Sequence, residues 1–356
     1  MPLSGASQQR LPVTRDFIRR HGWLMVLTVS LALHALIVLC FAIRWDRAAM
    51  VTIVPFPIWC ATGAFVAGLS LLWKRTTPGL VVLALWGMTF LWSDELRAWK
   101  NWGRPAPMQT GPMVDATNGQ RALRLVSYNT FRQSVPAAAE VKAWNPDIVF
   151  LQESPWTHDL QPLARELFGN EALLVMRPDC AIIARGKALQ VFEFKWPIPL
   201  PGGVPWVACG RLTLPDGRAL DLLNVHLLPA ERNWSFWSRQ TWRDHAENRR
   251  NRRFQLNLLL SAMRTITEKL PPAPVIVAGD FNAPARDSGL MVLPAFGLRD
   301  SYELAGSRPG NTFPNRFPLQ RIDQAWFSPD LVPVRHGTVK GVHSDHRMVI
   351  VDFLMP

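Results

Sequence analysis

Two uncharged apolar runs in the first quarter of the chain constrain the fold more than any other feature of the sequence. Residues 23–43 carry no formal charge and one notable polar side chain, His34, and residues 51–73 form a second uncharged run with Pro55 and Pro57 near its start. A helix rises 1.5 Å per residue, so about 20 residues cross a hydrocarbon core of about 30 Å. The first run is too long for a cleaved signal peptide, and charged residues follow it instead of a small-residue cleavage site. We therefore expect both runs to be transmembrane helices.

A third apolar run, residues 78–93, leaves the number of crossings open between two and three. This run is shorter and would cross only where the bilayer thins or flanking residues contribute. Arginines before the first run place the N-terminus in the cytoplasm by the positive-inside rule. Three crossings would export everything after the anchor of residues 1–98, whereas two crossings would leave it in the cytoplasm. We expect three, and so an integral protein of a bacterial plasma membrane with its remainder outside the cytoplasm, although Arg97, Lys100 and Arg104 argue against this orientation.

The composition changes after the anchor. Residues 99–122 are rich in glycine and proline, which predicts a flexible linker. From residue 123 to 356, short β-branched or apolar runs alternate with helical patterns, which predicts one α/β or α+β domain with partly antiparallel strands. We expect strands near residues 124–128, 147–152, 181–185, 204–214, 219–226, 275–279, 322–328 and 348–353, and helices near 136–144, 160–168 and 236–269.

Acidic, amide and imidazole side chains stand at the ends of these expected strands. In chain order they are Asn129, Gln152-Glu153, Asn224-Val225-His226, Gly279-Asp280-Phe281-Asn282, Arg321-Ile322-Asp323 and Ser344-Asp345-His346. Each group alone has a simple structural explanation, such as a turn, a helix cap or a surface ion pair. Together they offer carboxylate and amide oxygens without thiolates, a set that suits Mg²⁺ or Mn²⁺ better than structural zinc.

Such a set of side chains can hydrolyse a phosphate ester. A carboxylate near the metal can take a proton from water, and the metal and histidines can neutralise the charge that develops on the phosphoryl oxygens. The chain has no glycine-rich phosphate loop, nucleophile elbow or His-Glu-x-x-His motif, which argues against nucleoside-triphosphate, esterase and zinc-protease chemistry. The pattern therefore favours metal-assisted phosphate-ester hydrolysis.

The six motifs, in this order, resemble the endonuclease/exonuclease/phosphatase superfamily, the DNase I-like metallohydrolases, in a membrane-anchored form of bacterial type. The resemblance covers about residues 123–354. It implies a four-layer fold in which two packed β-sheets are flanked by helices, here preceded by the transmembrane helices. It also implies a Mg²⁺- or Mn²⁺-dependent hydrolase that acts by in-line attack of an activated water.

The resemblance implies a metal site formed by Glu153 with Asn129 and Asp345 nearby. Arg185, at the end of an expected strand, is a candidate phosphate contact by the same resemblance.

It also implies the roles of the catalytic residues. Asp280 would orient or deprotonate the attacking water, and Asn282 and His226 would donate hydrogen bonds to the scissile phosphate. His346 would contact the same phosphate, kept protonated by Asp323, because a nearby acid raises the pKa of an imidazole.

The family acts on DNA, RNA, sphingomyelin-type lipids and inositol phosphates, so the resemblance leaves the substrate open. We predict a phosphodiesterase that acts on nucleic acid or phospholipid. Between residues 233 and 254, aromatic side chains are interleaved with arginines, a mixture that can stack bases, lie on a lipid surface or simply form one face of a packed helix. The net charge of +12 fits an anionic partner of either kind.

An alternative function is a catalytically inactive binding module of the same fold, tethered to the membrane. The presence of Glu153, Asp280, Asn282 and His346 favours the enzyme. No protein partner can be inferred from the sequence. The chain has only four cysteines, which excludes a disulfide scaffold, and Cys180 and Cys209 are the pair that could join in an exported domain.

Overall fold

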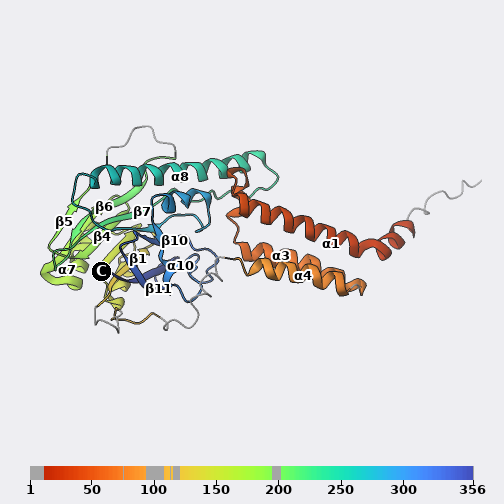
Figure 1. Cartoon of the computed structure of the whole chain (residues 1–356), viewed down its shortest axis with the longest axis horizontal. Coiled ribbons are helices and arrows are strands. Elements are labelled where there is room, and N and C mark those ends of the chain that lie inside the picture. Colours follow the sequence, from red (N-terminus) through yellow and green to blue (C-terminus); the bar gives the residue numbers. More distant parts are fainter. Residues whose placement is uncertain are drawn as a thin grey trace, which may run out of the picture. The chain divides into compact units, whose positions relative to one another are not determined.

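The computed structural model describes residues 12–74, 76–93, 108–112, 114, 121–194 and 202–355, and these residues form two compact units. One unit contains the described residues up to Trp45 together with Val54–Ser93, and we call it the helical unit. The other contains Asp46–Ile53 and the described residues from 108 onward, and we call it the catalytic unit (Figure 1). Most of the predicted linker, residues 99–122, lies outside the described residues.

The helical unit consists of apolar helices that pack through small side chains. Its elements are α1 (Pro12–Ile43), α3 (Phe56–Leu69) with the short η2 (Ser70–Trp73), and α4 (Thr76–Phe90). The Trp86 indole donates to Ser30 Oγ at 3.0 Å, and Ser30 Oγ donates to the Gly63 carbonyl at 2.9 Å. A Cβ atom on Gly63 would lie 2.0 Å from the Trp86 ring, so glycine is required for this close approach.

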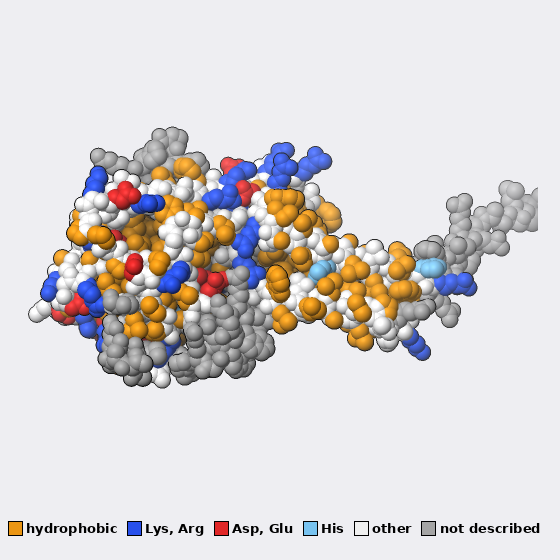
Figure 2. All heavy atoms as spheres, in the orientation of Figure 1, with side chains coloured by type: hydrophobic (Ala, Val, Ile, Leu, Met, Phe, Trp, Pro, Cys, Tyr) orange, Lys and Arg blue, Asp and Glu red, His pale blue; other side chains and the backbone are white. Residues whose placement is uncertain are grey.

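Two helical stretches are long and apolar enough to cross a membrane. They are Arg20–Ile43, with 24 residues, and Phe56–Trp73, with 18; α4 is shorter, with 15. Hydrophobic side chains cover most of the visible surface of α1, α3 and α4 (Figure 2). The second helix begins later than the expected residue 51, because Pro55 disfavours a helical conformation in the residue before it and cannot itself donate a backbone hydrogen bond.

Two six-stranded sheets form the centre of the catalytic unit. The first has the strand order β11-β12-β1-β2-β4-β3 and the second the order β5-β6-β7-β8-β10-β9. Neighbours pair antiparallel except β1 with β2 and β7 with β8, which are parallel. The bounds are β1 Leu123–Asn129, β2 Ile148–Gln152, β3 Ala172–Arg177, β4 Cys180–Arg185, β5 Ala188–Val191, β6 Trp206–Thr213, β7 Ala219–His226, β8 Val275–Asp280, β9 Arg299–Asp300, β10 Asp323–Phe327, β11 Val332–Lys340 and β12 Arg347–Leu354.

Three hydrophobic clusters separate four layers. Leu125 and Phe150 of the first sheet meet Leu222 and Ile276 of the second in a core from which water is excluded. A second cluster lies between the first sheet and the helices that cover it, and a third between the second sheet and its helices. The covering elements are α6 (Val135–Ala139), η4 (Glu140–Trp144), α7 (Thr157–Phe168) and η5 (Gly169–Glu171) by the first sheet, and α8 (Arg239–Thr267), η6 (Ser288–Met291) and α9 (Val292–Ala295) by the second (Figure 1). The short α10 (Ser301–Ala305) contacts both sheets, through β11 of the first and β10 of the second.

The four-layer arrangement confirms the expected fold class. The helix α8 shows why its sequence folds this way: Leu256, Leu259, Leu260 and Met263 recur at helical spacing and are buried in the cluster under the second sheet. All of the expected strands are present with small shifts of their ends. The strands that the sequence pattern did not reveal are β3, β5, β9 and β11, the edge strands of the two sheets. Cys180 and Cys209 are buried free thiols.

The residues between α1 and α3 belong to the catalytic unit. We call this stretch, Asp46–Ile53, the inter-helix segment; it contains η1 (Asp46–Ala48) and α2 (Ala49–Thr52). Arg253 of α8 pairs with Asp46 and also donates to Ser288 Oγ at 3.0 Å. Arg249, which is 1% exposed, donates to Thr52 Oγ1 and lies 2.9 Å from the Asp287 carboxylate. The α8 arginines are therefore not all solvated, because these two fix the inter-helix segment.

Candidate active site

The strand ends meet because both sheets contain a central parallel pair. Asn129 at the end of β1 is the register partner of Gln152 at the end of β2. In the second sheet, His226 at the end of β7 is likewise opposite Asp280 at the end of β8. Parallel neighbours finish at the same edge of a sheet, so each pair presents its polar side chains on one side of the catalytic unit.

A hydrogen bond between the sheets holds the two edges together. Gln152 Nε2 donates to Asn224 Oδ1 at 2.6 Å, and Asn224 Nδ2 donates to the carbonyls of Leu151 and Ala181 at 2.9 and 2.8 Å. Both side chains are fully buried. Gln152 and Asn224 thus hold the two sheets together at the site. The other polar residues of the same two motifs, Glu153 and His226, line the cavity.

These strand ends surround a cavity of about 570 Å³. Six of the residues expected from the sequence line it: Glu153, His226, Asp280, Asn282, Asp345 and His346. Asn129 and Asp323 are buried and hydrogen-bonded to lining residues. Arg185 is not brought into this group; it lies at the far end of β4 from Cys180, with its guanidinium 3.7 Å from Glu171 and 4.0 Å from Asp147.

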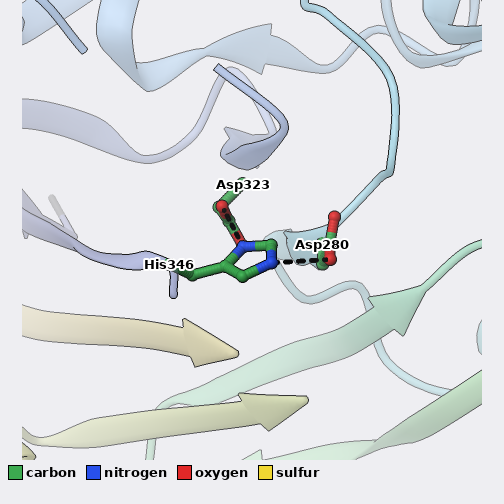
Figure 3. A group of neighbouring side chains, drawn as sticks. All are labelled: Asp280, Asp323 and His346. Carbon is green, nitrogen blue, oxygen red and sulfur yellow. Dashed lines mark hydrogen bonds and ion pairs between the residues drawn. The ribbon is translucent and has the colours of Figure 1, made fainter. Parts of the chain in front are cut away.

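His346 lies between two carboxylates (Figure 3). Its Nδ1 is 2.9 Å from Asp323 Oδ2, and its Nε2 is 3.9 Å from Asp280 Oδ2. Burial opposes the charge of this imidazole, but the charge and hydrogen bond of Asp323 outweigh burial and raise the pKa of His346 to about 10. His346 is therefore an imidazolium at neutral pH, with one N–H available toward the cavity.

His226 has a similar arrangement on the other side of Asp280. Its Nδ1 is hydrogen-bonded to the Asp179 carboxylate, and its Nε2 lies 3.8 Å from Asp280 Oδ2. Burial lowers the pKa of His226, but the hydrogen bond to Asp179 and the charge of Asp280 outweigh it, and the pKa is raised. The sequence reasoning missed Asp179, which occupies the turn between β3 and β4 with a left-handed φ of 71°. The Pro178-Asp179 turn signal was present, but no motif gave it a chemical role.

Asp280 is a buried carboxylate between these two histidines. Burial and then the neighbouring Asp323 charge raise its pKa, and the two histidines partly offset that rise. The Asn282 backbone N–H donates to Asp280 Oδ1 at 2.8 Å, and the Asn129 amide nitrogen lies 3.1 Å from Asp280 Oδ2. A carboxylate with a raised pKa next to two fixed donors can accept a proton from water beside a bound anion.

Glu153, Asn129 and Asp345 form an acidic corner of the cavity. Glu153 follows β2 with a left-handed φ of 46°; its Oε1 accepts from Asn129 Nδ2 at 3.2 Å and its Oε2 accepts from the Arg132 backbone N–H at 2.7 Å. Asp345 Oδ1 is buried and has no hydrogen-bond partner among the described residues. Burial, and to a lesser extent the Glu153 charge, raise the pKa of Asp345. The Oδ1 atom of Asp345 lies 4.0 Å from His346 Nε2 and close to a second carboxylate, Glu153, and two neighbouring carboxylates are ligands that a hard cation prefers.

A second group of possible cation ligands consists of Asp280, Asp323 and His346, whose ligand atoms lie within 4.8 Å of one another. A cation there would have to displace the hydrogen bond between His346 and Asp323. The acidic corner also faces His346, which lies 4.0 Å from Asp345 Oδ1, but it requires no such displacement. The acidic corner therefore fits a cation better.

We call the acidic, amide and imidazole residues described above the floor of the cavity and the remaining lining residues its rim. The rim combines apolar and aromatic side chains with charged ones, among them Arg132, Glu231 and Arg232. Ile53, Phe131, Trp206, Trp234 and Phe313 contribute side chains around the opening. The Phe313 ring lies 4.9 Å from that of His346, and the Trp206 ring lies 5.2 Å from that of His226. Both histidines are thus covered on one side by an aromatic ring, which limits access of water to them.

Comparisons with known proteins agree with this geometry. A model described as the Endonuclease/Exonuclease/phosphatase family matches residues 126–346. The mannosyl-6-phosphatase of Bacteroides thetaiotaomicron is 21% identical, with 65% of this chain and 100% of that chain covered and a TM-score of 0.50. The human Nocturnin catalytic domain with bound sulfate is 21% identical, covering 66% and 95%, with a TM-score of 0.52.

A third solved structure, the endonuclease/exonuclease/phosphatase from Bacteroides vulgatus, is 17% identical, covering 67% of this chain and 100% of that chain, with a TM-score of 0.51. At these identities the similarity to solved structures establishes the fold alone. The comparison with curated proteins gives no match.

Proposed function

This chain belongs to the endonuclease/exonuclease/phosphatase family and is a hydrolase of phosphate esters, and on that premise we propose that it is a divalent-metal-dependent phosphodiesterase whose nucleophile is water. One observation carries the proposal: two histidines, each bonded to its own aspartate, face the same oxygen of Asp280 from 3.8 and 3.9 Å. The arrangement supplies one general base and two cationic donors around one cavity.

The side chains then have separate tasks. Asp280 would orient a water molecule and accept its proton as the water attacks phosphorus. His226 and His346 would donate from Nε2 to the phosphoryl oxygens, and each would keep its charge because its Nδ1 faces an aspartate. Asn282 holds Asp280 through its backbone N–H, and its side-chain amide donates to the Leu227 carbonyl at 2.9 Å, which fixes the turn after β8.

Glu153 and Asp345 would hold the divalent ion, with Asn129 beside Glu153. When bound there, Mg²⁺ or Mn²⁺ would supply positive charge that stabilises the negative charge developing on the phosphoryl and leaving-group oxygens. Asn129 links the two parts of the site, because its amide nitrogen contacts both Glu153 and Asp280.

Matched chromogenic esters test this proposal on the full chain in detergent. We expect hydrolysis of p-nitrophenyl methyl phosphate, a diester, that requires added Mg²⁺ or Mn²⁺ and stops with EDTA, and a lower kcat/KM for p-nitrophenyl phosphate, a monoester. A higher kcat/KM for the monoester would make the protein a phosphatase. Absence of turnover on both, in a folded protein with metal, would contradict the enzymatic role and favour a binding module.

We propose further that the chain crosses the membrane three times and that the catalytic unit lies outside the cytoplasm. The inter-helix segment packs on α8 and so must lie on the same side of the membrane as the catalytic unit. With the N-terminus in the cytoplasm, α1 crosses the membrane once, so the inter-helix segment lies outside the cytoplasm. The helix α3 then returns to the cytoplasm, where Lys74 and Arg75 follow it, and α4 has to cross again.

A cysteine-accessibility experiment tests this topology. Asp216 lies in the exposed turn between β6 and β7, and Lys74 follows η2. We expect a membrane-impermeant maleimide to label Asp216→Cys in intact cells and to label Lys74→Cys only after lysis. The reverse pattern would place the catalytic unit in the cytoplasm, and labelling of both positions only after lysis would contradict a crossing by α4.

A further inference from the structure

The inter-helix segment forms part of the cavity wall as well as part of the catalytic unit. Ile53 lines the cavity, and Gln320 Nε2, which also belongs to the lining, donates to the Ile53 carbonyl at 2.5 Å. Ile53 is 5% exposed, so it is fixed by its neighbours. All of the proposed catalytic and metal-binding side chains come from the end of β1 or from later in the chain. The proposed chemistry therefore does not need this part of the cavity wall.

Another part of the rim carries aromatic side chains that face solvent. The loop from Pro229 to Trp237, which we call the aromatic loop, lies between β7 and α8. Trp234 is 47% exposed and lines the cavity, and Trp237 is 98% exposed. The Trp234 ring packs on that of His245, with ring centroids 5.4 Å apart, yet about half of the side chain stays exposed, and Trp237 is almost fully exposed. Exposed aromatic side chains beside a cavity indicate a surface that contacts something else.

Positive charge accompanies the aromatic loop. Arg232 lies in the loop and lines the cavity, and Arg239, Arg243 and Arg250 are exposed on α8, which follows it. Exposed indole rings with nearby arginines are typical of surfaces that meet the headgroup region of an anionic membrane. The same composition suits single-stranded nucleic acid, so a further observation has to separate the two.

The inter-helix segment supplies that observation. Ile53 is followed within three residues by Phe56, the first residue of an apolar helix long enough to cross a membrane. With α3 in a bilayer, as proposed above, the chain connection keeps this wall of the cavity near the membrane surface. A nucleic acid would gain nothing from a buried isoleucine at the cavity wall, whereas an alkyl group would bury apolar area against it.

From these observations we propose that Ile53 and Trp234 select phosphate esters that carry an apolar chain, so that the substrate of the site is an amphiphilic lipid phosphate presented by a membrane. This inference rests on the proposed phosphodiesterase function and assigns its substrate class. Ile53 and Trp234 act as specificity-determining residues and take no part in proton transfer.

Three esters that release the same p-nitrophenol test the proposal. They are p-nitrophenyl methyl phosphate, p-nitrophenyl hexadecyl phosphate in mixed micelles and thymidine 5′-p-nitrophenyl phosphate, each assayed with the full chain and Mg²⁺. We expect kcat/KM for the hexadecyl ester to exceed that for the methyl ester at least about tenfold, because burial of a few methylene groups suffices for that ratio. A wild-type ratio near one would overturn the proposal while leaving the phosphodiesterase function intact.

Variants locate the selectivity on the rim. Ile53→Asp and, separately, Trp234→Ala should each lower the hexadecyl-to-methyl ratio at least about fivefold, since each removes apolar contact area. Val332→Asp places the same charged side chain outside the cavity, at a position 43% exposed at the start of β11, and should leave the ratio as in the wild type.

Trp234→Ala keeps the test valid if Ile53→Asp fails to fold, because the indole is on the surface, and circular dichroism melting checks each variant. An equal loss of the thymidine and hexadecyl activities in Trp234→Ala would instead identify the aromatic loop as a nucleic-acid platform and overturn the proposal. If the wild type hydrolyses none of the three esters, the phosphodiesterase function fails, an outcome distinct from an unchanged ratio.

Discussion

The floor and the rim of the cavity are built in different ways. Floor residues such as His226 and Asp280 stand at the ends of central strands, are almost fully buried and are held by hydrogen bonds from both sheets. Most of the aromatic and apolar rim residues, such as Ile53 and Trp234, come from segments outside the sheets, with Trp206 at the start of β6 as an exception, and several rim side chains face solvent.

The difference separates two requirements of the site. Proton transfer needs positions fixed within a fraction of an ångström, which a packed sheet provides. Choice of substrate depends on contacts around the phosphate, and loops can change these contacts without disturbing the floor. The predictions below test whether changes at the floor and at the rim have separable effects.

The largest expected effect is that of Asp280→Asn at the floor. The amide cannot accept the proton of the attacking water, so we expect kcat for p-nitrophenyl methyl phosphate to fall about 10²–10⁴-fold. Because the pKa of Asp280 is raised by burial, the neutral amide suits this position and the melting temperature should not fall by more than a few degrees. Asp216→Asn, in an exposed turn, is the matched control and should behave as wild type. Retained turnover in the folded Asp280→Asn variant would show that another group is the base.

The next effect concerns the acidic corner of the floor. Glu153→Gln removes a carboxylate charge from the proposed metal site, so the Mg²⁺ concentration at half-maximal rate should rise more than about tenfold. Isothermal titration with Mn²⁺ measures the same loss without turnover. Glu171→Gln changes an exposed carboxylate that pairs with Arg185 and should leave both measurements unchanged. An unaltered metal requirement in Glu153→Gln would place the ion elsewhere, with the group of Asp280, Asp323 and His346 as the alternative.

The floor could be predicted from the sequence to a much greater extent than the rim. Its residues directly follow strands buried on both faces, whose continuous apolar runs are easy to recognise, and the motifs that follow them are short and local. The edge strands β5 and β9 escaped notice because one is mostly exposed and the other has two residues, so neither has a clear hydrophobic pattern.

Contacts between distant parts of the chain could not be predicted in this way. The link between Arg253 and Asp46 spans 207 residues, and the pairing of His226 with Asp179 depends on the turn between β3 and the adjacent β4. Only the fold brings such residues together, and no local pattern marks them as partners. For the same reason the sequence assigned Val51 to a membrane helix, whereas it belongs to α2 of the catalytic unit.

A smaller effect is expected for Asp179→Asn, next to the floor. Asp179 is hydrogen-bonded to His226 and in the proposed mechanism accepts no proton from water, so kcat should fall about tenfold, less than for Asp280→Asn. The loss of the carboxylate leaves burial less opposed, and the pKa of His226 should move down from its raised value. NMR titration of the imidazole measures that shift, and Asp179→Glu should restore part of it. A normal rate together with an unshifted His226 pKa would remove Asp179 from the site.

The smallest expected effect on the chemical step is that of Arg253→Ala, which loosens the rim. This change removes the partly exposed ion pair with Asp46 and the hydrogen bond to Ser288, contacts that together contribute about 1 kcal/mol or less. We expect limited proteolysis within the inter-helix segment to become faster and the hexadecyl-to-methyl ratio to fall, while kcat for the methyl ester changes by less than about threefold. Arg264→Ala removes an exposed pair at the end of α8, with Glu268 just after the helix, and serves as the control. If Arg253→Ala lowered kcat for the methyl ester as strongly as Asp280→Asn, the inter-helix segment would be part of the catalytic floor, and its role would extend beyond substrate choice.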